Sequence, residues 1–391
     1  MTPVWDPDEA VELLREWIRI DTCNPPGSEH RLAFAIGQFL GKWGIPAHIE
    51  PLDGNRSNVT AVLPGKGGRK LMFCGHLDTV AAWSASSGAY PPHDAVMEAG
   101  RIYGRGAADM KSGLAAMLLA FVSLKRDGIA LDGDLLFLAA AGEEIDSCGA
   151  QAYVRKAGTK DLSAIVIGEP TGGQVAAGHK GALWLRLEAS GRSAHASMPE
   201  NGRNAVEALM GAAAWLRHRE PEWRTSDPLL GTTSMAFTRI AGGVQTNIVP
   251  DRCELEIDIR FVPPWDGYSL HRHLSAQLAE WKMGREDIRV ELKPLLIRNP
   301  VLTPESDPII RHALGLCPGP DGAAGAVTYY TDGSVLQSDG KPPVLLYGPG
   351  EPGQAHRPDE WVDVKAYLTA IAFYRELAMR YLGTNGRHLE I

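Results

Sequence analysis

The chain has 391 residues, of which 39 are basic, 47 are acidic and 44% are hydrophobic, and its formal net charge at pH 7 is −8. This acidic balance argues against nucleic acid or an anionic membrane surface as the main partner. The length allows two domains with at least one sizeable core. The best candidate for a membrane span, residues 114–124, is far shorter than the ~20 apolar residues required.

The N-terminal sequence and the cysteines predict a cytoplasmic protein. The first residues, MTPVWDPDEAVELL, carry acids where a signal peptide would carry lysines, and no apolar segment follows them. The five cysteines are odd in number, scattered and without CxxC spacing. Reduced thiols are therefore expected rather than a disulfide framework.

Helical patterns and short apolar segments alternate in the first part of the chain. Asp6 is expected to cap the first helix, with Pro7 at its first position, and a second helix is expected from about Ser28 to Trp43, ended by Gly44. Strands are expected at 58–63, 71–75, 134–141 and 164–168, and a further helix at about 110–126. This alternation indicates an α/β fold, a mostly parallel sheet with helices on both faces. In such sheets, functional residues gather beyond the carboxyl ends of the strands.

The middle of the chain follows a different pattern, which begins with period-two alternation at residues 183–189. The expected order is β-α-β-β-α-β, the ferredoxin-like pattern. Its elements are expected at 183–189, 203–217, 233–241, 253–259, 268–281 and 288–293. The α/β pattern then returns, with a helix near 307–316, a strand at 343–348 and a closing helix from about 363. We therefore predict a domain of residues 1–179 and 294–391 that is interrupted by an inserted domain of residues 180–293.

Two adjacent glutamates, Glu143 and Glu144, directly follow an expected buried strand. Like charges repel, and carboxylates at such a position lose hydration unless they are paired. The pair therefore either opens a solvated loop or helix start, where the helix dipole favours acids, or lies beside a cation.

Further ligand-type side chains occur at the other expected strand ends and in glycine-rich loops. They are His76, Asp78, Asp109, Glu169 and His356. A lone histidine at a strand end is more often a surface residue, but a solvated face has no reason to place an acid or histidine at every strand end. Two histidines with several carboxylates suit Zn²⁺, with Co²⁺ and Mn²⁺ as alternatives. A second metal ion is also expected, because one carboxylate can bridge two ions ~3.5–4 Å apart.

Five segments carry a family resemblance: GHLDTV (75–80), GRGAADMKSG (104–113), GEEIDSCGA (142–150), GEPT (168–171) and GPGEPGQAHRPDEW (348–361). Together they resemble the co-catalytic two-zinc amidohydrolases and peptidases, which include acetylornithine deacetylase, succinyl-diaminopimelate desuccinylase and the glutamate carboxypeptidases. The resemblance covers nearly the whole chain in family order. It implies a catalytic metal-binding domain of zinc-exopeptidase type, interrupted by a ferredoxin-like lid that often dimerises, and hence a homodimer.

The resemblance also implies roles for the ligand-type residues. His76 and Glu169 would bind one of two divalent ions, Glu144 and His356 the other, and Asp109 would bridge them. It further implies a cis peptide bond between Asp109 and Met110.

The remaining two acids would serve the reaction. Asp78 would accept the second imidazole N–H of His76 and fix its tautomer. Glu143 would act as general base, taking a proton from a metal-bridging water and passing it to the leaving amine.

The inserted domain supplies further candidates by the same resemblance. His195, in GRSAHASMPENGRNA (191–205), would stabilise the tetrahedral oxyanion; the alternative is a buried, hydrogen-bonded loop histidine. Asn247 and Arg260 would hold the substrate's carboxylate, but Arg260 could equally form a cross-strand ion pair. Lys180, in GHKG, resembles the corresponding segment of the deacetylases.

The sequence thus predicts a metal-dependent hydrolase that cleaves the amide bond of an N-acyl amino acid with a free carboxylate. The alternative is a carboxypeptidase or dipeptidase of the same chemistry. Glu169, rather than aspartate, favours the deacylase and carboxypeptidase branch, while TDGS (331–334) only partly matches the desuccinylase turn. A metal-dependent phosphoesterase is disfavoured because a glycine-rich phosphate cradle is lacking. A non-catalytic metal or dimerisation module would not need Glu143 beside Glu144.

Overall fold

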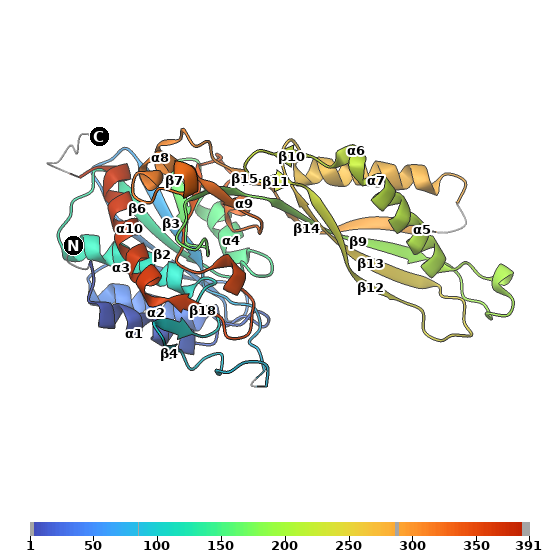
Figure 1. Ribbon diagram of the computed structural model, residues 1–391, viewed down its shortest axis with the longest axis horizontal. Coiled ribbons are helices and arrows are strands. Elements are labelled where there is room, and N and C mark those ends of the chain that lie inside the picture. The colour runs from blue at the N-terminus through green and yellow to red at the C-terminus, as the bar shows by residue number, and fades with distance from the viewer. Residues whose placement is uncertain (1–3, 85, 286–288, 385–391) are drawn as a thin grey trace. The chain divides into compact units, whose positions relative to one another are not determined.

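The computed structural model describes residues 4–84, 86–285 and 289–384 (Figure 1). The chain divides into two compact units. The first comprises Met1–Gly178, Val301–Ala326 and Thr331–Ile391, and the second comprises His179–Pro300 and Val327–Tyr330. Within the described ranges, none of the helices combines the length and apolar character needed to cross a membrane.

The first unit is built on a nine-stranded sheet with the order β1-β2-β6-β3-β7-β17-β8-β15, and β16 pairs with β8. Its strands are β1 (Ala47–Pro51), β2 (Ser57–Leu63), β3 (Lys70–His76), β6 (Asp134–Ala140), β7 (Ala164–Ile167), β8 (Ala176–His179), β15 (Val301–Leu302), β16 (Gly325–Val327) and β17 (Val344–Leu346). The four central strands β6, β3, β7 and β17 are parallel neighbours. The predicted mainly parallel sheet is therefore confirmed, with antiparallel strands such as β1 and β2 added at its margin.

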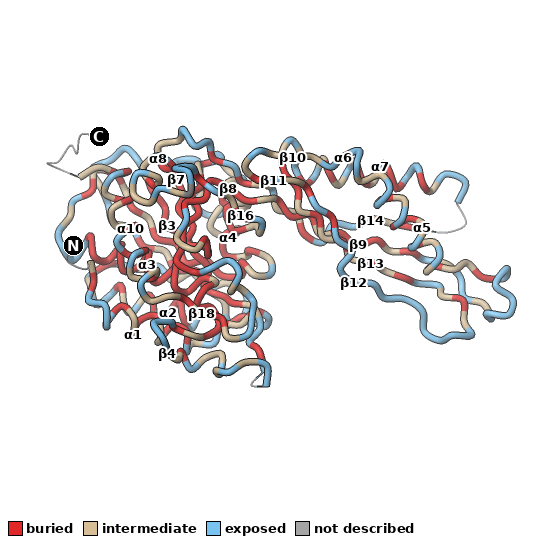
Figure 2. The backbone as a smooth tube through the Cα atoms, viewed as in Figure 1, coloured by how far each residue is buried: buried red, intermediate tan, exposed pale blue. Residues whose placement is uncertain are grey.

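Helices cover this sheet on both faces. Successive side chains of a strand point to opposite faces, and every residue of β3 from Leu71 to His76 is buried, as Figure 2 shows for the central strands. The helices α3 and α10 pack against each other and against β3 and β6, while α4 packs against β6 and α9. The helices of this unit are α1 (Pro7–Arg19), α2 (Glu29–Lys42), α3 (Lys111–Arg126), α4 (Cys148–Ala157), α8 (Pro308–Leu314), α9 (Gly333–Leu336) and α10 (Val364–Leu382).

Local signals place several of these elements. Asp6 caps α1, and its carboxylate accepts hydrogen bonds from the backbone N–H groups of Asp8 and Glu9, as predicted. Gly44 follows α2 with φ +65°, a conformation that glycine adopts without a Cβ penalty. A separate three-stranded sheet was not predicted; it consists of β4 (Val96–Glu98), β5 (Arg101–Tyr103) and β18 (Trp361–Asp363). Short 3₁₀ helices also occur at Pro199–Asn201, Pro320–Gly322 and Pro352–Gln354.

The second unit contains a four-stranded antiparallel sheet with the order β12-β13-β9-β14. Its elements are β9 (Gly181–Ser190), α5 (Ala205–His218), α6 (Glu220–Trp223), β10 (Ser226–Asp227), β11 (Gly231–Thr232), β12 (Ser234–Gly242), β13 (Arg252–Phe261), α7 (Gly267–Lys282) and β14 (Arg289–Arg298). The predicted β-α-β-β-α-β order is confirmed, and β14 continues to Arg298, beyond its predicted end at 293. Alternate residues of β13 are buried, and α5 and α7 pack on the sheet, which leaves a polar second face.

Candidate active site

Three parallel strands of the first unit deliver acids and a histidine to one edge of the sheet. His76 is the last residue of β3, Glu143 and Glu144 follow β6, and Glu169 follows β7. Because parallel strands end at the same edge, these side chains are brought together there. Asp109 comes from the loop before α3.

The carboxylate of Asp109 lies between two imidazoles that are far apart in the chain. Its Oδ1 is 3.1 Å from Nε2 of His76, and its Oδ2 is 3.3 Å from Nε2 of His356. His356 adopts φ +64°, an unusual backbone conformation for a residue with a side chain. One carboxylate with an oxygen toward each histidine is the arrangement that a bridging ligand requires.

Each histidine also faces a second carboxylate. The Nε2 atom of His76 is 3.8 Å from Oε1 of Glu169, and the Nε2 atom of His356 is 3.1 Å from Oε2 of Glu144. The other Glu144 oxygen accepts a hydrogen bond from the N–H of Val80 at 3.2 Å. The structure therefore brings together all five residues expected to hold metal, in the two expected pairs.

Asp78 orients this cluster in a different way from the one expected. The Nδ1 atom of His76 is 2.8 Å from the main-chain oxygen of Asp78, whereas the Asp78 carboxylate is 3.6 Å away. A carbonyl oxygen only accepts, so Nδ1 carries a proton and Nε2 is the nitrogen that faces the cluster and can bind a metal ion. The Asp78 carboxylate instead accepts from the N–H groups of Gly142, Glu143 and Glu144, and so fixes the glutamate turn.

The two glutamates lie in a buried turn, which excludes the alternative of a solvated loop or helix start. Glu143 is 7% exposed, the side chain of Glu144 is 6% exposed, and the next helix begins only at Cys148. The peptide bond between Asp109 and Met110 is cis, as expected.

Burial and mutual repulsion dominate the electrostatics of the cluster. Burial and the negative charge of Glu169 raise the pKa of Glu143 well above 4.5. Burial and the negative charge of Asp109 raise the pKa of Glu169 in the same way. Burial would lower the pKa of His76, but its hydrogen bond to Asp109 and the charge of Glu169 raise it well above 6.5. Hydrogen bonds with Asp109 and Glu144 raise the pKa of His356 to about 10. Positive charge is thus strongly favoured at this position.

The side chains fit divalent cations. Two groups in this cluster have ligand atoms that all lie within 4.8 Å of one another: His76, Asp109 and Glu144, and His76, Glu143 and Glu169. Nitrogen and carboxylate oxygen are the donors that Zn²⁺, Mn²⁺ and Co²⁺ accept. The Oε1 atom of Glu143 is buried without a hydrogen-bond partner among the described residues, so this atom is left for a ligand or water.

One functional residue was missed by the sequence reasoning. Glu360 is fully buried, and its carboxylate accepts from Arg105 at 2.7 Å and from the N–H groups of Gly106, Ala108 and Asp109 at 3.1, 2.8 and 2.9 Å. Burial raises the pKa of Glu360, and the charge of Arg105 opposes this shift. Glu360 therefore holds the loop that presents Asp109. The available signal was its place in the DEW triplet, four residues after His356.

In the second unit, His195 is exposed, contrary to the alternative of a buried loop histidine. Its Nδ1 accepts a hydrogen bond from the N–H of Ser197 at 3.1 Å, so Nε2 is the protonated nitrogen. The N–H of Ala196 donates to the main-chain oxygen of Asn247 at 2.9 Å. The segments that carry His195 and Asn247 therefore lie side by side.

The other two candidates of this unit are already engaged. Arg260 forms two hydrogen bonds with Asp258, at 2.9 and 3.0 Å, and both lie on β13, so the expected cross-strand pair is an intrastrand one. Lys180 donates to the main-chain oxygen of Thr232, and partial burial lowers its pKa.

Comparison with known proteins identifies the family. Residues 72–380 match the peptidase family M20/M25/M40. The chain is 27% identical over 405 residues to a probable succinyl-diaminopimelate desuccinylase of Staphylococcus aureus, which covers 96% of this chain and 98% of that protein. It is 26% identical over 375 residues to a peptidase M20 domain-containing protein of Schizosaccharomyces pombe, and the alignment covers 95% of this chain and 84% of that protein.

Solved structures share the fold. An M20 family metallo-carboxypeptidase from Sulfolobus solfataricus superimposes with a TM-score of 0.81 at 20% identity, covering 96% of this chain and 99% of that one. Human carnosine dipeptidase 1 gives a TM-score of 0.71 at 18% identity, covering 95% and 97%. The chain belongs to the M20/M25/M40 peptidase family and is a metal-dependent hydrolase.

Proposed function

We propose that this enzyme hydrolyses the amide bond of an N-acyl amino acid whose carboxylate is free. The observation that carries the proposal is the position of Asp109 between His76 and His356, with the unpartnered carboxylate oxygen of Glu143 beside them. This arrangement provides a place for cations and a separate base for the reaction.

Five residues would hold two divalent ions, for which we propose Zn²⁺, with Co²⁺ or Mn²⁺ as alternatives. They are His76, Asp109, Glu144, Glu169 and His356. When bound, the ions supply Lewis acidity that activates a water molecule and polarises the amide carbonyl. Asp78 keeps the Nε2 atom of His76 available through its main-chain oxygen.

Glu143 would take the proton of the attacking water and deliver it to the nitrogen of the leaving amine. Nearby cations would lower its pKa and so oppose the effect of burial. The Nε2–H of His195 would donate to the developing oxyanion, a contribution that is strongest when charge appears in the transition state.

We further propose that Asn247 and Arg260 hold the substrate's carboxylate. Lys180, the residue directly before β9, is a further candidate for binding the substrate. Support comes from the polar face of β13, on which Arg260 lies, and from the proximity of Asn247 to the His195 segment. A carboxypeptidase or dipeptidase with the same chemistry is the second candidate function. The names of the carboxypeptidase and carnosine dipeptidase relatives favour it.

We also propose that the protein is a homodimer formed through the second unit. β12 is an edge strand, and Met210, Phe237 and Ile240, on α5 and β12, are 61%, 38% and 60% exposed beside a groove. An unpaired edge next to apolar side chains favours pairing with a second copy. Ile240→Glu should shift the mass measured by light scattering from dimer to monomer. A wild-type protein that is already a monomer would contradict this proposal.

We propose a cytoplasmic location, with which the five free cysteines agree.

Glu143→Gln tests the catalytic assignment. The amide keeps the shape of the side chain but cannot take a proton, so we expect turnover to fall by about 10²–10⁴-fold. Metal content, measured by elemental analysis, should remain that of the wild type. Loss of metal together with activity would contradict the role of Glu143 as a base outside the ligand set. Wild-type protein stripped by a chelator should be inactive and recover when Zn²⁺ or Co²⁺ is returned.

Substrate screening separates the two candidate functions. N-acetyl, N-succinyl and N-formyl amino acids should be compared with dipeptides on the same metal-loaded enzyme. A higher kcat/KM for an N-acyl amino acid than for dipeptides supports the deacylase function. A higher kcat/KM for dipeptides would contradict it and support the peptidase function.

A further inference from the structure

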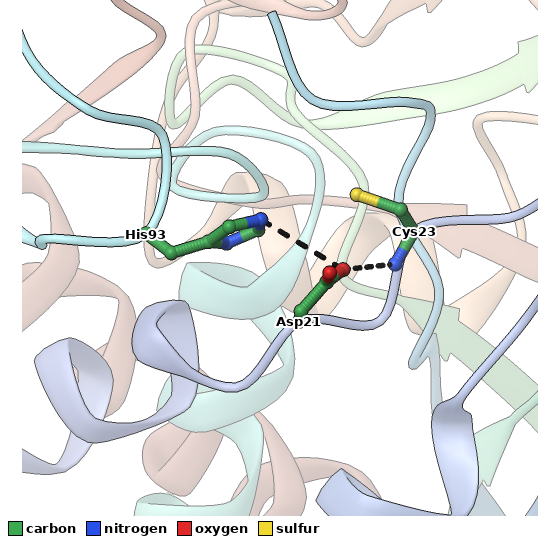
Figure 3. Close-up of side chains that lie close together, drawn as sticks. All are labelled: Asp21, Cys23 and His93. Carbon is green, nitrogen blue, oxygen red and sulfur yellow. Dashed lines mark hydrogen bonds and ion pairs between the residues drawn. The ribbon is translucent and has the colours of Figure 1, made fainter. Parts of the chain in front are cut away.

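A second group of metal-ligand side chains lies outside the proposed active site, in the first unit. Asp21 and Cys23 belong to the connection between α1 and α2, and His93 belongs to the segment before β4. One ligand atom from each residue lies within 4.8 Å of the other two. Figure 3 shows the carboxylate, the thiol and the imidazole around a common space.

The local hydrogen bonds prepare these side chains for a cation. The Nδ1 atom of His93 is 3.3 Å from the main-chain oxygen of Ile18, which only accepts, so Nδ1 carries the proton. In the neutral imidazole, the Nε2 atom then carries the lone pair that can bind a metal ion, and it lies 3.7 Å from Oδ1 of Asp21. The N–H of Cys23 donates to the same carboxylate oxygen at 2.9 Å and fixes its orientation.

The spacing suits an ion more than a direct bond. A separation of 3.7 Å is too long for a hydrogen bond between Nε2 and Oδ1. The edge between a nitrogen and an oxygen ligand of a tetrahedral zinc site is about 3.3–3.5 Å, so a shift of a few tenths of an ångström would bring both atoms to the same ion. The side chain of Asp21 is 54% exposed, so an ion has access from solvent.

The nearby ammonium of Lys111 donates its hydrogen bonds to main-chain oxygens and not to the three ligand atoms. Lys111 is buried near Asp21 and Cys23, but its ammonium donates to the main-chain oxygens of Trp17 and Ile20 at 3.0 and 2.8 Å. The sulfur of Cys23 accepts a weak hydrogen bond from the hydroxyl of Thr79 at 3.7 Å. Burial and the neighbouring Asp21 side chain raise the pKa of this thiol, and a bound metal ion would favour the thiolate.

We propose that Asp21, Cys23 and His93 form an additional divalent-cation site that binds Zn²⁺, with solvent completing the coordination. Thiolate, imidazole and carboxylate together are the donors that select zinc among common divalent ions. The site is separate from the proposed two-metal centre and does not depend on the proposed reaction.

The site is positioned to stabilise the active-site turn. The side chain of Asn24, next to Cys23, donates to the Asp78 carboxylate at 2.9 Å, and the N–H of Asn24 donates to the oxygen of Thr79 at 2.8 Å. Asp78 in turn fixes the turn of Glu143 and Glu144. A cation on Cys23 would therefore restrain the segment that supports this turn.

Cobalt spectroscopy tests the site on the zinc-loaded enzyme. One further equivalent of Co²⁺ should produce a sulfur-to-cobalt charge-transfer band, because only a thiolate ligand gives this band and the proposed active-site ligands include no cysteine. Cys23→Ser should abolish the band and release one metal ion per chain in equilibrium dialysis. The matched control Cys317→Ser, which changes another half-buried thiol, should keep both signals.

His93→Gln provides a second, independent variant if Cys23→Ser does not fold. The amide can still donate to the oxygen of Ile18 but offers a poorer metal ligand, so we expect Co²⁺ affinity at this site to fall by at least about 10–100-fold. Absence of the band in the wild type, or its persistence in Cys23→Ser or at full affinity in His93→Gln, overturns the proposal.

Discussion

The two units of the molecule hold their functional candidates in opposite ways. In the first unit, the side chain of His76 is 1% exposed and that of Asp109 is 12% exposed, and buried carboxylates surround both. In the second unit, His195 and Asn247 are exposed and are linked mainly through their backbone. Burial fixes the geometry of reactive groups at a high electrostatic cost, which a cation offsets. Groups for substrate recognition can remain at the surface, because their charge or hydrogen bond is needed only when the substrate arrives.

The largest effect should come from breaking the buried support of the first unit. Glu360→Gln removes the charge that pairs with Arg105 and replaces one of the two oxygens that accept from the Asp109 loop with an NH₂ group. Breaking one partner of a buried ion pair costs about 3–5 kcal/mol. We therefore expect the free energy of unfolding, measured with denaturant, to fall by that amount, and we expect metal to bind more weakly.

Asp359→Asn is the matched control, because Asp359 lies in the same loop but is only half-buried, where it accepts from the N–H groups of Ala89 and Tyr90. Its cost should not exceed about 1 kcal/mol. Equal losses in the two variants would show that burial of Glu360 has no special importance for this loop.

Local sequence signals predicted most of the fold, because they depend on near neighbours. The cap at Asp6 and the apolar runs of β3, β6 and β7 are each visible within a few residues. The strand β1 was not predicted because it is short and has no buried residue that would mark it in the sequence. Its extended conformation is stabilised by its antiparallel pairing with β2.

The side-chain partners inside the site were harder to predict than its members. Asp78 was assigned to His76, but its carboxylate lies against the N–H groups of the glutamate turn. Glu360 was not assigned at all, although it holds the Asp109 loop. Both choices depend on contacts between distant segments of the chain, and neither residue type nor spacing specifies such contacts.

The next effect should come from the exposed histidine of the second unit. His195→Ala removes the proposed donor to the oxyanion, so we expect kcat to fall by about 10²–10³-fold. Metal content and the unfolding free energy should be unchanged, because the side chain is exposed. The control is His218→Ala, an exposed histidine of α5, which should retain wild-type kcat. A change in KM alone would assign His195 to binding instead.

The smallest effect should come from Arg260, because Asp258 already satisfies its guanidinium. Hydrogen bonds to a charged group contribute about 1.5–3 kcal/mol, and competition with Asp258 should reduce this to about a tenfold rise in KM for Arg260→Met. Arg186→Met is the control: Arg186 pairs with Glu256 on the same sheet, and KM should not change.

Asp258→Asn decides between the two roles of Arg260. This change releases the guanidinium without removing it, so a carboxylate substrate should bind more tightly and KM should fall. An arginine that serves only the intrastrand pair gives no such gain. The direction of this shift therefore tells whether the polar face of β13 recognises substrate or only balances its own charges.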